Sequence, residues 1–422
     1  MRRHACALAL AVVAAACTVG GQDEVVTVLV AGDPAELQAY RDVADAFERG
    51  DPGIDVRLIE VAERDDLILR LSTSIAAGDP PDLFLLNYRY YGQFAANGSL
   101  EPVAPYLAES TTLSAEDFYP EAMEPFRFDG VQTCLPQNVS SLVVYFNRDR
   151  FRAAGIEEPA AGWTWRQMVA KATELTRDED GDGVPDVYGL GVDPEIIRVA
   201  PFIWSNGAEL VDDTERPTGF TLGDPAATEA LQLFLDLRAL HGVVPTDEEA
   251  ESRDLESRFL DGTLAMLMES RRVTPTLRTI TDFSWDVAPL PMLGAPAGIL
   301  HSDAYCMTVG SGDHDVAWRY LEFALGPEGQ RIAAETGRTV PSLIDVANSD
   351  AFLDPSDAPV SSRVFLDAIP GIRAVPHVST WPEIEDATNA LLEEAYYGEG
   401  SASEIVPQIE RVTAPLFARA EG

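Results

Sequence analysis

The fold is decided by Val25-Val26-Thr27-Val28-Leu29-Val30, by Ile54-Asp55-Val56-Arg57-Leu58-Ile59-Glu60-Val61 and by Pro81-Asp82-Leu83-Phe84-Leu85-Leu86. Each segment is rich in β-branched or aliphatic residues, and short apolar runs of this kind predict buried strands. Between these runs, apolar residues recur at helical spacing over 37–47 and 67–76. The order strand, helix, strand, helix, strand predicts a parallel sheet covered by helices, so we expect an α/β protein.

The rest of the chain contains a second α/β region and a helical C-terminal part. Its apolar patterns predict strands at 142–146, 265–268 and 285–289 and helices at 165–176, 226–241 and 250–260. Further helices are predicted at 318–325, 327–336, 382–397 and 405–420. Because no repeat or flexible linker interrupts the chain, we expect its domains to be joined by ordered crossings.

The composition is that of a globular and strongly acidic protein. The 422 residues are 46% hydrophobic, 24% charged and 8% aromatic, and their formal net charge is −40. A surface this acidic repels phosphate backbones, so nucleic-acid binding is not expected. At about 100–200 residues per domain, the chain is long enough for two or three domain cores.

The first residues are typical of an export signal. Arg2 and Arg3 precede an uncharged apolar run, 5–16, that is too short to span a membrane and fits a secretory signal. Ala14-Ala15-Ala16-Cys17 resembles a bacterial lipobox, so we expect a lipoprotein signal peptide over 1–17, with Cys17 lipidated. The protein would then be exported to the cell envelope and held at the membrane by its lipid alone. The alternative is plain cleavage before Cys17 without lipidation.

No recognised catalytic motif stands out in the sequence. It has no Gly-x-Ser-x-Gly elbow, no glycine-rich phosphate loop, and only five histidines, which are scattered. Once the signal is removed, Cys134 and Cys306 are the two cysteines of the folded body, and in an oxidising compartment they allow a single pairing. We therefore expect no catalytic residues and no obligatory cofactor.

One acidic loop has the spacing of a calcium site. Asp178, Asp180, Asp182 and Asp186 occupy positions 1, 3, 5 and 9 of a loop whose sixth residue is Gly183. A hard cation such as calcium prefers this density of oxygen ligands around a glycine turn. However, the twelfth position, where a bidentate glutamate belongs, is a glycine. The alternative is an acidic surface turn without a metal.

Two further places are candidates for contact with a solute. Asn87 and Tyr88 directly follow the third predicted strand, and open α/β sheets bind ligands at the carboxyl ends of their strands. Trp204 fits either a cleft or the core.

Ordered landmarks make the chain resemble the extracellular solute-binding proteins of bacterial ABC importers, in the sugar-binding group that includes maltose-binding protein. The landmarks include Ala77-Gly78-Asp79-Pro80-Pro81-Asp82-Leu83, Leu142-Val143-Val144-Tyr145-Phe146-Asn147-Arg148-Asp149 and Phe259-Leu260-Asp261-Gly262-Thr263-Leu264-Ala265-Met266. Each landmark is weak by itself, but together they occur in the family's order over nearly the whole mature chain.

The resemblance implies a two-lobed periplasmic-binding-protein fold, with two α/β sheets and a hinge around a ligand cleft. One lobe would comprise 23–134 and 305–355, and the other 135–304 and 356–422. The implied function is the capture of a carbohydrate or carbohydrate derivative outside the cytoplasm by a monomer, and its delivery to the membrane subunits of an ABC permease. The alternatives are an exported glycan-active enzyme, or the same fold with a polyamine, peptide or anion as its solute.

The resemblance also implies particular site residues. Trp381 stands where the family often has a cleft tryptophan, so we expect it to stack on a sugar ring. Ser140 and Asp303 lie beside the crossings between the lobes, where ligand contacts are common. Arg272 replaces a family tryptophan, which favours an acidic ligand or vicinal hydroxyls, unless Arg272 forms an internal ion pair. The family places the segments of Cys134 and Cys306 side by side, which implies a disulfide.

Overall fold

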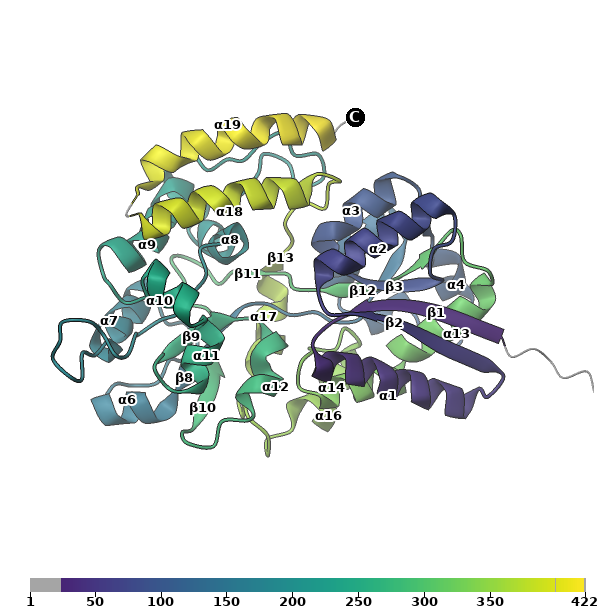
Figure 1. Cartoon of the computed structure of the whole chain (residues 1–422), viewed down its shortest axis with the longest axis horizontal. Coiled ribbons are helices and arrows are strands. Elements are labelled where there is room, and N and C mark those ends of the chain that lie inside the picture. Colours follow the sequence, from purple (N-terminus) through teal and green to yellow (C-terminus); the bar gives the residue numbers. More distant parts are fainter. Residues whose placement is uncertain (1–23, 399, 421–422) are drawn as a thin grey trace, which may run out of the picture.

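The computed structural model describes residues 24–398 and 400–420, which form two halves, each built around its own β-sheet (Figure 1). Cys17 and the rest of the predicted signal lie outside the described residues. Within the part that is described, no helix has the length and apolar character needed to cross a membrane.

The first half contains a sheet of strand order β2-β1-β3-β12-β4. Its strands are β1 (Glu24–Ala31), β2 (Ile54–Val61), β3 (Leu83–Asn87), β4 (Leu100–Glu101) and β12 (Asp303–Thr308). β1 pairs in parallel with both β2 and β3, as the order of the first three strands predicts. β12 returns from a distant part of the sequence and pairs antiparallel with β3.

Helices cover this sheet, and local signals fix where they begin and end. They are α1 (Pro34–Gly50), α2 (Arg64–Ala77), α3 (Tyr88–Ala96), α13 (His314–Leu325) and α14 (Pro327–Glu335). The carboxylate of Asp33 caps α1 by accepting hydrogen bonds from the backbone N–H groups of Ala35 and Glu36. α2 ends at Gly78, whose φ of 76° is a left-handed conformation that glycine adopts without steric cost.

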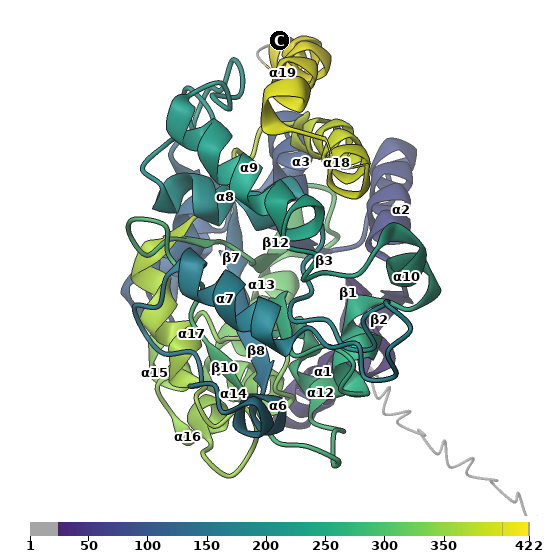
Figure 2. The ribbon, with the colours of Figure 1, turned by 90° about the vertical axis from the view of Figure 1, so that its left-hand side faces the viewer.

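The second half is built around a three-stranded antiparallel sheet of order β10-β8-β9. Its strands are β8 (Val143–Asn147), β9 (Met266–Glu269) and β10 (Trp285–Ala288). The helices of this half are α6 (Arg148–Ala154), α7 (Trp165–Leu175), α8 (Ile196–Ser205), α9 (Pro225–Ala239), α10 (Asp247–Ser252), α11 (Leu255–Leu260), α18 (Trp381–Tyr397) and α19 (Ala402–Ala420). Figure 2 shows this half from its outer side, with α7 in front of the sheet.

Two neighbouring strands carry the chain between the halves. β7 (Cys134–Pro136) leaves the first half and pairs antiparallel with β12, along which the chain returns. The predicted lobe limits at 134/135 and 304/305 fall inside these two strands. Cys134 and Cys306 face each other in this ladder and are joined by a disulfide, with their Cα atoms 4.4 Å apart.

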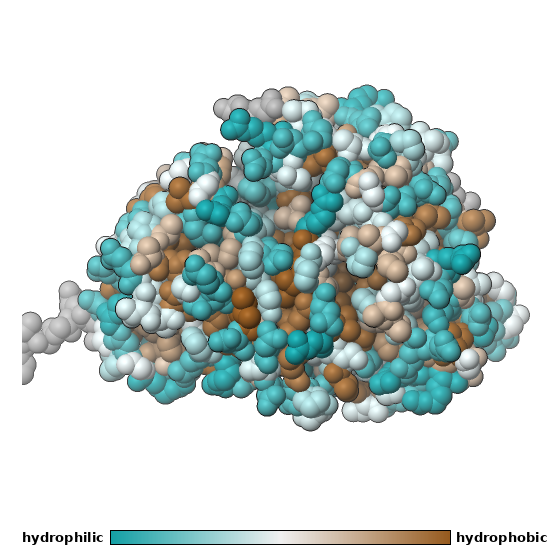
Figure 3. All heavy atoms as spheres, turned by 180° about the vertical axis from the view of Figure 1, so that it is seen from behind, coloured by the Kyte–Doolittle hydropathy of each residue, from teal (hydrophilic) through white to brown (hydrophobic). Residues whose placement is uncertain are grey.

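Short α-helices and strands lie between these larger elements. They are α4 (Ala104–Glu109), α5 (Pro120–Met123), β5 (Arg127–Phe128), β6 (Val131–Gln132), α12 (Thr274–Leu277), β11 (Gly298–Ile299), α15 (Ile344–Ala347), α16 (Asp350–Leu353), α17 (Arg363–Ala368) and β13 (Ile372–Arg373). Hydrophilic residues are spread over both halves on the face opposite to that of Figure 1 (Figure 3). The architecture is the predicted two-lobed α/β fold.

Candidate ligand-binding site

A cavity of about 800 Å³ lies between the two halves. On the side of the first half it is lined at the carboxyl ends of β1, β2 and β3, where α1, α2 and α3 begin. On the side of the second half it is lined by residues around the start of α8, the end of β9 and one face of α18. Its volume is within the range of about 300–1,000 Å³ typical of small-molecule sites.

Four of the predicted ligand-binding residues line this cavity: Asn87, Ser140, Arg272 and Asp303. Asn87 ends β3, and its side-chain oxygen accepts a hydrogen bond from the backbone N–H of Arg89 at the start of α3. Asp303 begins β12 directly opposite Asn87 in the ladder. Both therefore lie at the same edge of the sheet. The strand pattern predicted Asn87 there, whereas Asp303 was predicted from the family resemblance.

Trp381 does not line this cavity, which corrects its predicted stacking role. It is fully buried, with no exposed surface, and its ring packs at a centroid distance of 6.0 Å against Phe220. The indole N–H donates a hydrogen bond of 2.9 Å to Glu385, which does line the cavity. Trp381 therefore supports the cavity wall from behind.

Tyr88 and Trp204 also lie outside the cavity lining. This contradicts the prediction for Tyr88, and for Trp204 it favours the core, which was one of the two alternatives, over the cleft. Tyr88 is fully buried, and its hydroxyl accepts a hydrogen bond from the backbone N–H of Val375. Trp204 is buried as well, with the guanidinium of Arg373 4.9 Å from its ring centroid. Both side chains therefore contact the segment 373–375.

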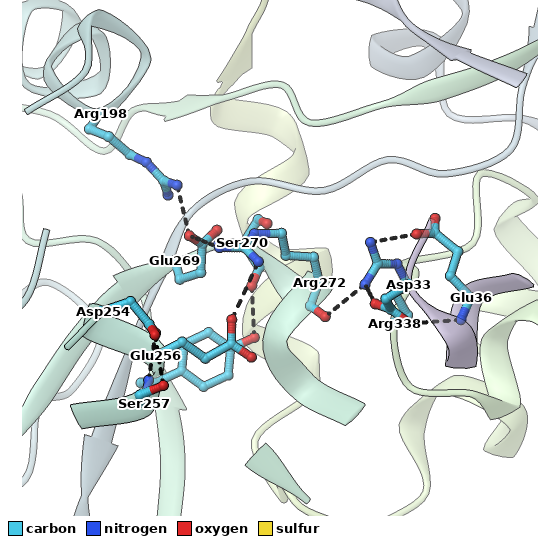
Figure 4. Close-up of polar contacts among 11 residues, drawn as sticks. Asp33, Glu36, Arg198, Asp254, Glu256, Ser257, Glu269, Ser270, Arg272 and Arg338 are labelled. Carbon is cyan, nitrogen blue, oxygen red and sulfur yellow. Dashed lines mark hydrogen bonds and ion pairs between the residues drawn. The ribbon is translucent and has the colours of Figure 1, made fainter. Parts of the chain in front are cut away.

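Arg272 lines the cavity but already has carboxylate partners. Its guanidinium lies 3.0 Å from Glu269 and 3.4 Å from Glu256 (Figure 4). This is the internal ion pair considered as the alternative in the sequence analysis. Arg198 approaches the same Glu269 at 2.7 Å, so this buried carboxylate has two cationic partners. Although burial opposes ionisation, Arg198 and Arg272 hold the pKa of Glu269 well below its usual value.

A second group of charges in the cavity wall joins the two halves. Arg338 contacts Asp33 at 2.7 Å and Glu36 at 2.6 Å, both from the first half. The same guanidinium donates a hydrogen bond of 3.3 Å to the backbone carbonyl of Arg272 in the second half. Figure 4 shows these contacts as one polar chain running from Arg198 to Glu36. None of Asp33, Glu36 or Arg338 was predicted, because more than 300 positions separate Glu36 from Arg338 in the sequence.

Several polar groups of the cavity wall have no partner among the described residues. Nη1 of Arg198 and Nε2 of His301 are buried and make no hydrogen bond. Burial lowers the pKa of His301 to about 3, so its ring is neutral. The carboxylates of Asp193 and Asp303 form no ion pair within the described chain. Groups with unmet hydrogen-bonding capacity are those that a bound solute would satisfy.

The acidic loop lies apart from the cavity. Carboxylate oxygens of Asp178, Asp180 and Asp186 lie within 4.8 Å of one another, and all three residues are exposed. Asp182 does not belong to this group. The oxygens of Asp178 and Asp186 already accept hydrogen bonds from backbone N–H groups of the loop. Calcium binding here stays a prediction.

The geometry defines a two-lobed binding protein with a solute-sized cavity between its lobes. Residues 31–331 match the family of bacterial extracellular solute-binding proteins, and the chain belongs to that family.

Similar proteins cover most of the chain. A binding protein of Brucella abortus is 24% identical over 374 residues, which are 87% of each chain. The diacetylchitobiose-binding protein of Streptomyces coelicolor is 23% identical and covers 88% of this chain and 84% of its own. An ABC substrate-binding protein of Listeria monocytogenes, solved with cycloalternan, has a TM-score of 0.85 at 23% identity, covering 94% of this chain and 100% of that one.

Proposed function

We propose that this protein captures a carbohydrate or carbohydrate derivative outside the cytoplasm and delivers it to an ABC permease. The observation that carries the proposal is the cavity between the lobes, whose wall is rich in hydrogen-bonding side chains from both halves. Sugars present a rim of hydroxyl groups, and the unpartnered Nη1 of Arg198 can donate to a hydroxyl oxygen. Relatives that are named for oligosaccharide ligands support the same class of solute.

The cavity also suggests how the solute is held. Among its lining residues, Tyr40 and Tyr90 are the aromatic side chains, and Tyr90 lies under the guanidinium of Arg64 at 5.5 Å. Recognition would therefore depend on hydrogen bonds and charge more than on stacking. Because the ligand touches both halves together only in a closed form, binding favours closure.

The proposal is tested by thermal denaturation with a panel of mono- and oligosaccharides, sugar acids, amino sugars, spermidine and short peptides. A ligand present at 100 times its dissociation constant stabilises the folded state by about 2.7 kcal/mol. We expect a saccharide to give the largest increase in Tm. Stabilisation by spermidine or a peptide but by no saccharide would contradict the proposal. Loss of uptake of the same saccharide on deletion of the gene would test delivery to a permease.

We also propose that the exported protein is a monomer anchored through a lipid on Cys17. The support for the anchor is the lipobox-like sequence Ala14-Ala15-Ala16-Cys17. Cys17→Ser should move the protein from the membrane fraction to the soluble fraction. An unchanged distribution would contradict lipidation.

A further inference from the structure

The charges that line the cavity are not balanced. Nine carboxylates and six arginines belong to its wall. Four of the arginines already have carboxylate partners: Arg338 contacts Asp33 and Glu36, Arg198 and Arg272 contact Glu269, and Arg89 contacts Glu385. An anionic solute would therefore meet guanidinium groups whose charge is already compensated by carboxylates, although Nη1 of Arg198 keeps a free N–H position.

Neither of the other two arginines places a buried guanidinium group in the cavity. Arg64 is exposed and lies over the ring of Tyr90. Arg271 is buried with its guanidinium 4.3 Å from the ring centroid of Phe352 and 5.0 Å from that of Phe365. Its single hydrogen bond, of 3.3 Å, goes to Ser362, so the charged end of Arg271 lies among residues that are not part of the cavity wall.

Four carboxylates of the wall lack such partners: Glu63 and Asp386 are exposed, whereas Asp193 and Asp303 are partly buried. Asp303 has one side-chain contact among the described residues, a hydrogen bond of 3.5 Å from the amide of Asn138. The Asp193 carboxylate makes neither a hydrogen bond nor an ion pair within the described chain, and burial raises its pKa to about 6. Asp193 precedes α8 in the second half, and Asp303 begins β12 in the first.

An unpaired and partly buried carboxylate lowers the stability of the ligand-free protein, because charge is costly to remove from water without a partner. A neutral polar side chain at these positions would bind sugar hydroxyls without that cost. A ligand cation would compensate both carboxylates, one from each half, when the lobes close on it.

We propose that the solute is a carbohydrate that carries at least one protonated amine, and that Asp193 and Asp303 bind this positive charge. The inference rests on the proposed function, which supplies the carbohydrate. An ammonium group donates charge-assisted hydrogen bonds, which are about twice as strong as neutral ones. Hydroxyl groups of the same ligand would take up the free hydrogen-bonding positions of Arg198 and His301.

The experiment compares three saccharide series of equal length by calorimetry near neutral pH. They are the oligomers of glucosamine, which carry free amines, those of N-acetylglucosamine, and the β-1,4-glucose oligomers. Titrations at about 0.5 M NaCl, where the Debye length is only about 4 Å, suppress general attraction by the acidic surface but screen a buried pair far less. We expect at least one glucosamine oligomer to bind about tenfold or more tightly than its two neutral counterparts.

Three variants identify the source of the preference. Asp193→Asn and Asp303→Asn should each reduce the preference for the amine about tenfold, while keeping a hydrogen-bonding side chain in place. Asp79→Asn is the matched control, because Asp79 is exposed, lies outside the cavity wall and forms no ion pair in the described chain. This control should leave the preference unchanged. Melting temperatures of all three variants check that they fold.

The outcomes separate this inference from the proposed function. Neutral oligomers that bind as tightly as the amines would overturn the inference and leave the proposed function standing. A preference for amines that persists in both cavity variants would overturn the assignment of Asp193 and Asp303. If spermidine binds whereas neither these three series nor any other saccharide of the thermal panel does, both the inference and the proposed function are overturned.

Discussion

Asp193 carries a charge that the folded protein holds without a partner. Burial raises its pKa from 3.8 to about 6, and this effect exceeds the opposing attraction of Arg198. The other charged residues near it are Glu195 and Glu269, which raise its pKa, and Arg272, which lowers it. Burial raises the pKa of the Tyr396 and Tyr397 hydroxyls on α18, and the charge of Asp193 raises it further.

Asp193→Asn should stabilise the ligand-free protein at neutral pH. A pKa raised by about two units costs the folded state about 2–3 kcal/mol at pH values above 6, where Asp193 is ionised in both states. Between about pH 6 and pH 4 the folded state takes up the proton first, so this cost disappears as the pH falls. Urea unfolding at pH 7.5 should therefore separate the variant from the wild type, and at pH 4 it should not. A variant less stable than the wild type at pH 7.5 would contradict this account.

Trp381→Ala should strongly reduce the free energy of unfolding, because Trp381 lies in the core. A tryptophan exposed in the cleft could be replaced at a much smaller cost. The change removes a fully buried indole and one of the two N–H donors to Glu385, leaving only Arg89. Large-to-small changes of this kind cost about 3–5 kcal/mol. Urea unfolding measures the loss, and Trp381→Phe, which keeps an aromatic ring, should recover most of it. Full stability combined with lost saccharide binding would instead restore the stacking role.

The site residues that could be predicted from the residues alone are those marked by a local sequence pattern. Asn87 ends a strand that the pattern defines, and its position at the sheet edge follows from the parallel order. Trp381 was wrongly predicted to lie in the cleft, because the polar residues before it indicated an exposed segment. In the folded chain its ring packs against Phe220, which lies about 160 positions earlier in the sequence. Asp193 and Arg338 belong to no motif, so only the folded chain brings them to the cavity.

At the scale of elements, Arg338 links the start of α1 to the segment that follows β9. Its contacts to Asp33 and Glu36 stay within the first half, whereas its bond to the carbonyl of Arg272 exists only while the halves are close. This bond therefore favours the closed arrangement.

Arg338→Gln should shift the protein toward an open form. A hydrogen bond from a charged group contributes about 1.5–3 kcal/mol when buried, and about 1 kcal/mol is expected here because Arg338 is partly exposed. Small-angle scattering should record a larger radius of gyration without ligand, and ligand dissociation should be severalfold faster. The control is Arg331→Gln, because the ion pair of Arg331 with Glu335 lies within α14. Identical scattering from the wild type and Arg338→Gln would contradict the role.

The paired strands β7 and β12 are also held by the bond between Cys134 and Cys306. Replacing both cysteines with serine should lower the free energy of unfolding by about 2–4 kcal/mol, because the bond closes a loop with a sequence separation of 172 and so restricts the unfolded chain. Urea unfolding with and without a reducing agent measures this. The reduced wild type should match the double variant, and the reductant should not affect the variant. Equal stability of oxidised and reduced wild type would contradict the expectation.

At the scale of the whole molecule, the architecture was more predictable than the site. Three apolar runs with helices between them predict β1, β2 and β3 and their parallel order. These strands and helices are specified by residues that are neighbours in the sequence, so local patterns are enough to find them. The partner of β3, however, is β12, which lies more than 200 positions away and comes from the resemblance rather than from any local pattern. The cavity combines side chains from many such distant segments, so its charge balance could not be read from the sequence.

The disulfide has a consequence for what a protease could release. The exposed loop 178–186 lies between Cys134 and Cys306 in the sequence, so a cut there leaves one cysteine on each fragment. The fragments would stay covalently joined and migrate as one band on a non-reducing gel, separating only after reduction. A nick in this loop therefore cannot separate the two pieces of the protein while the disulfide is intact.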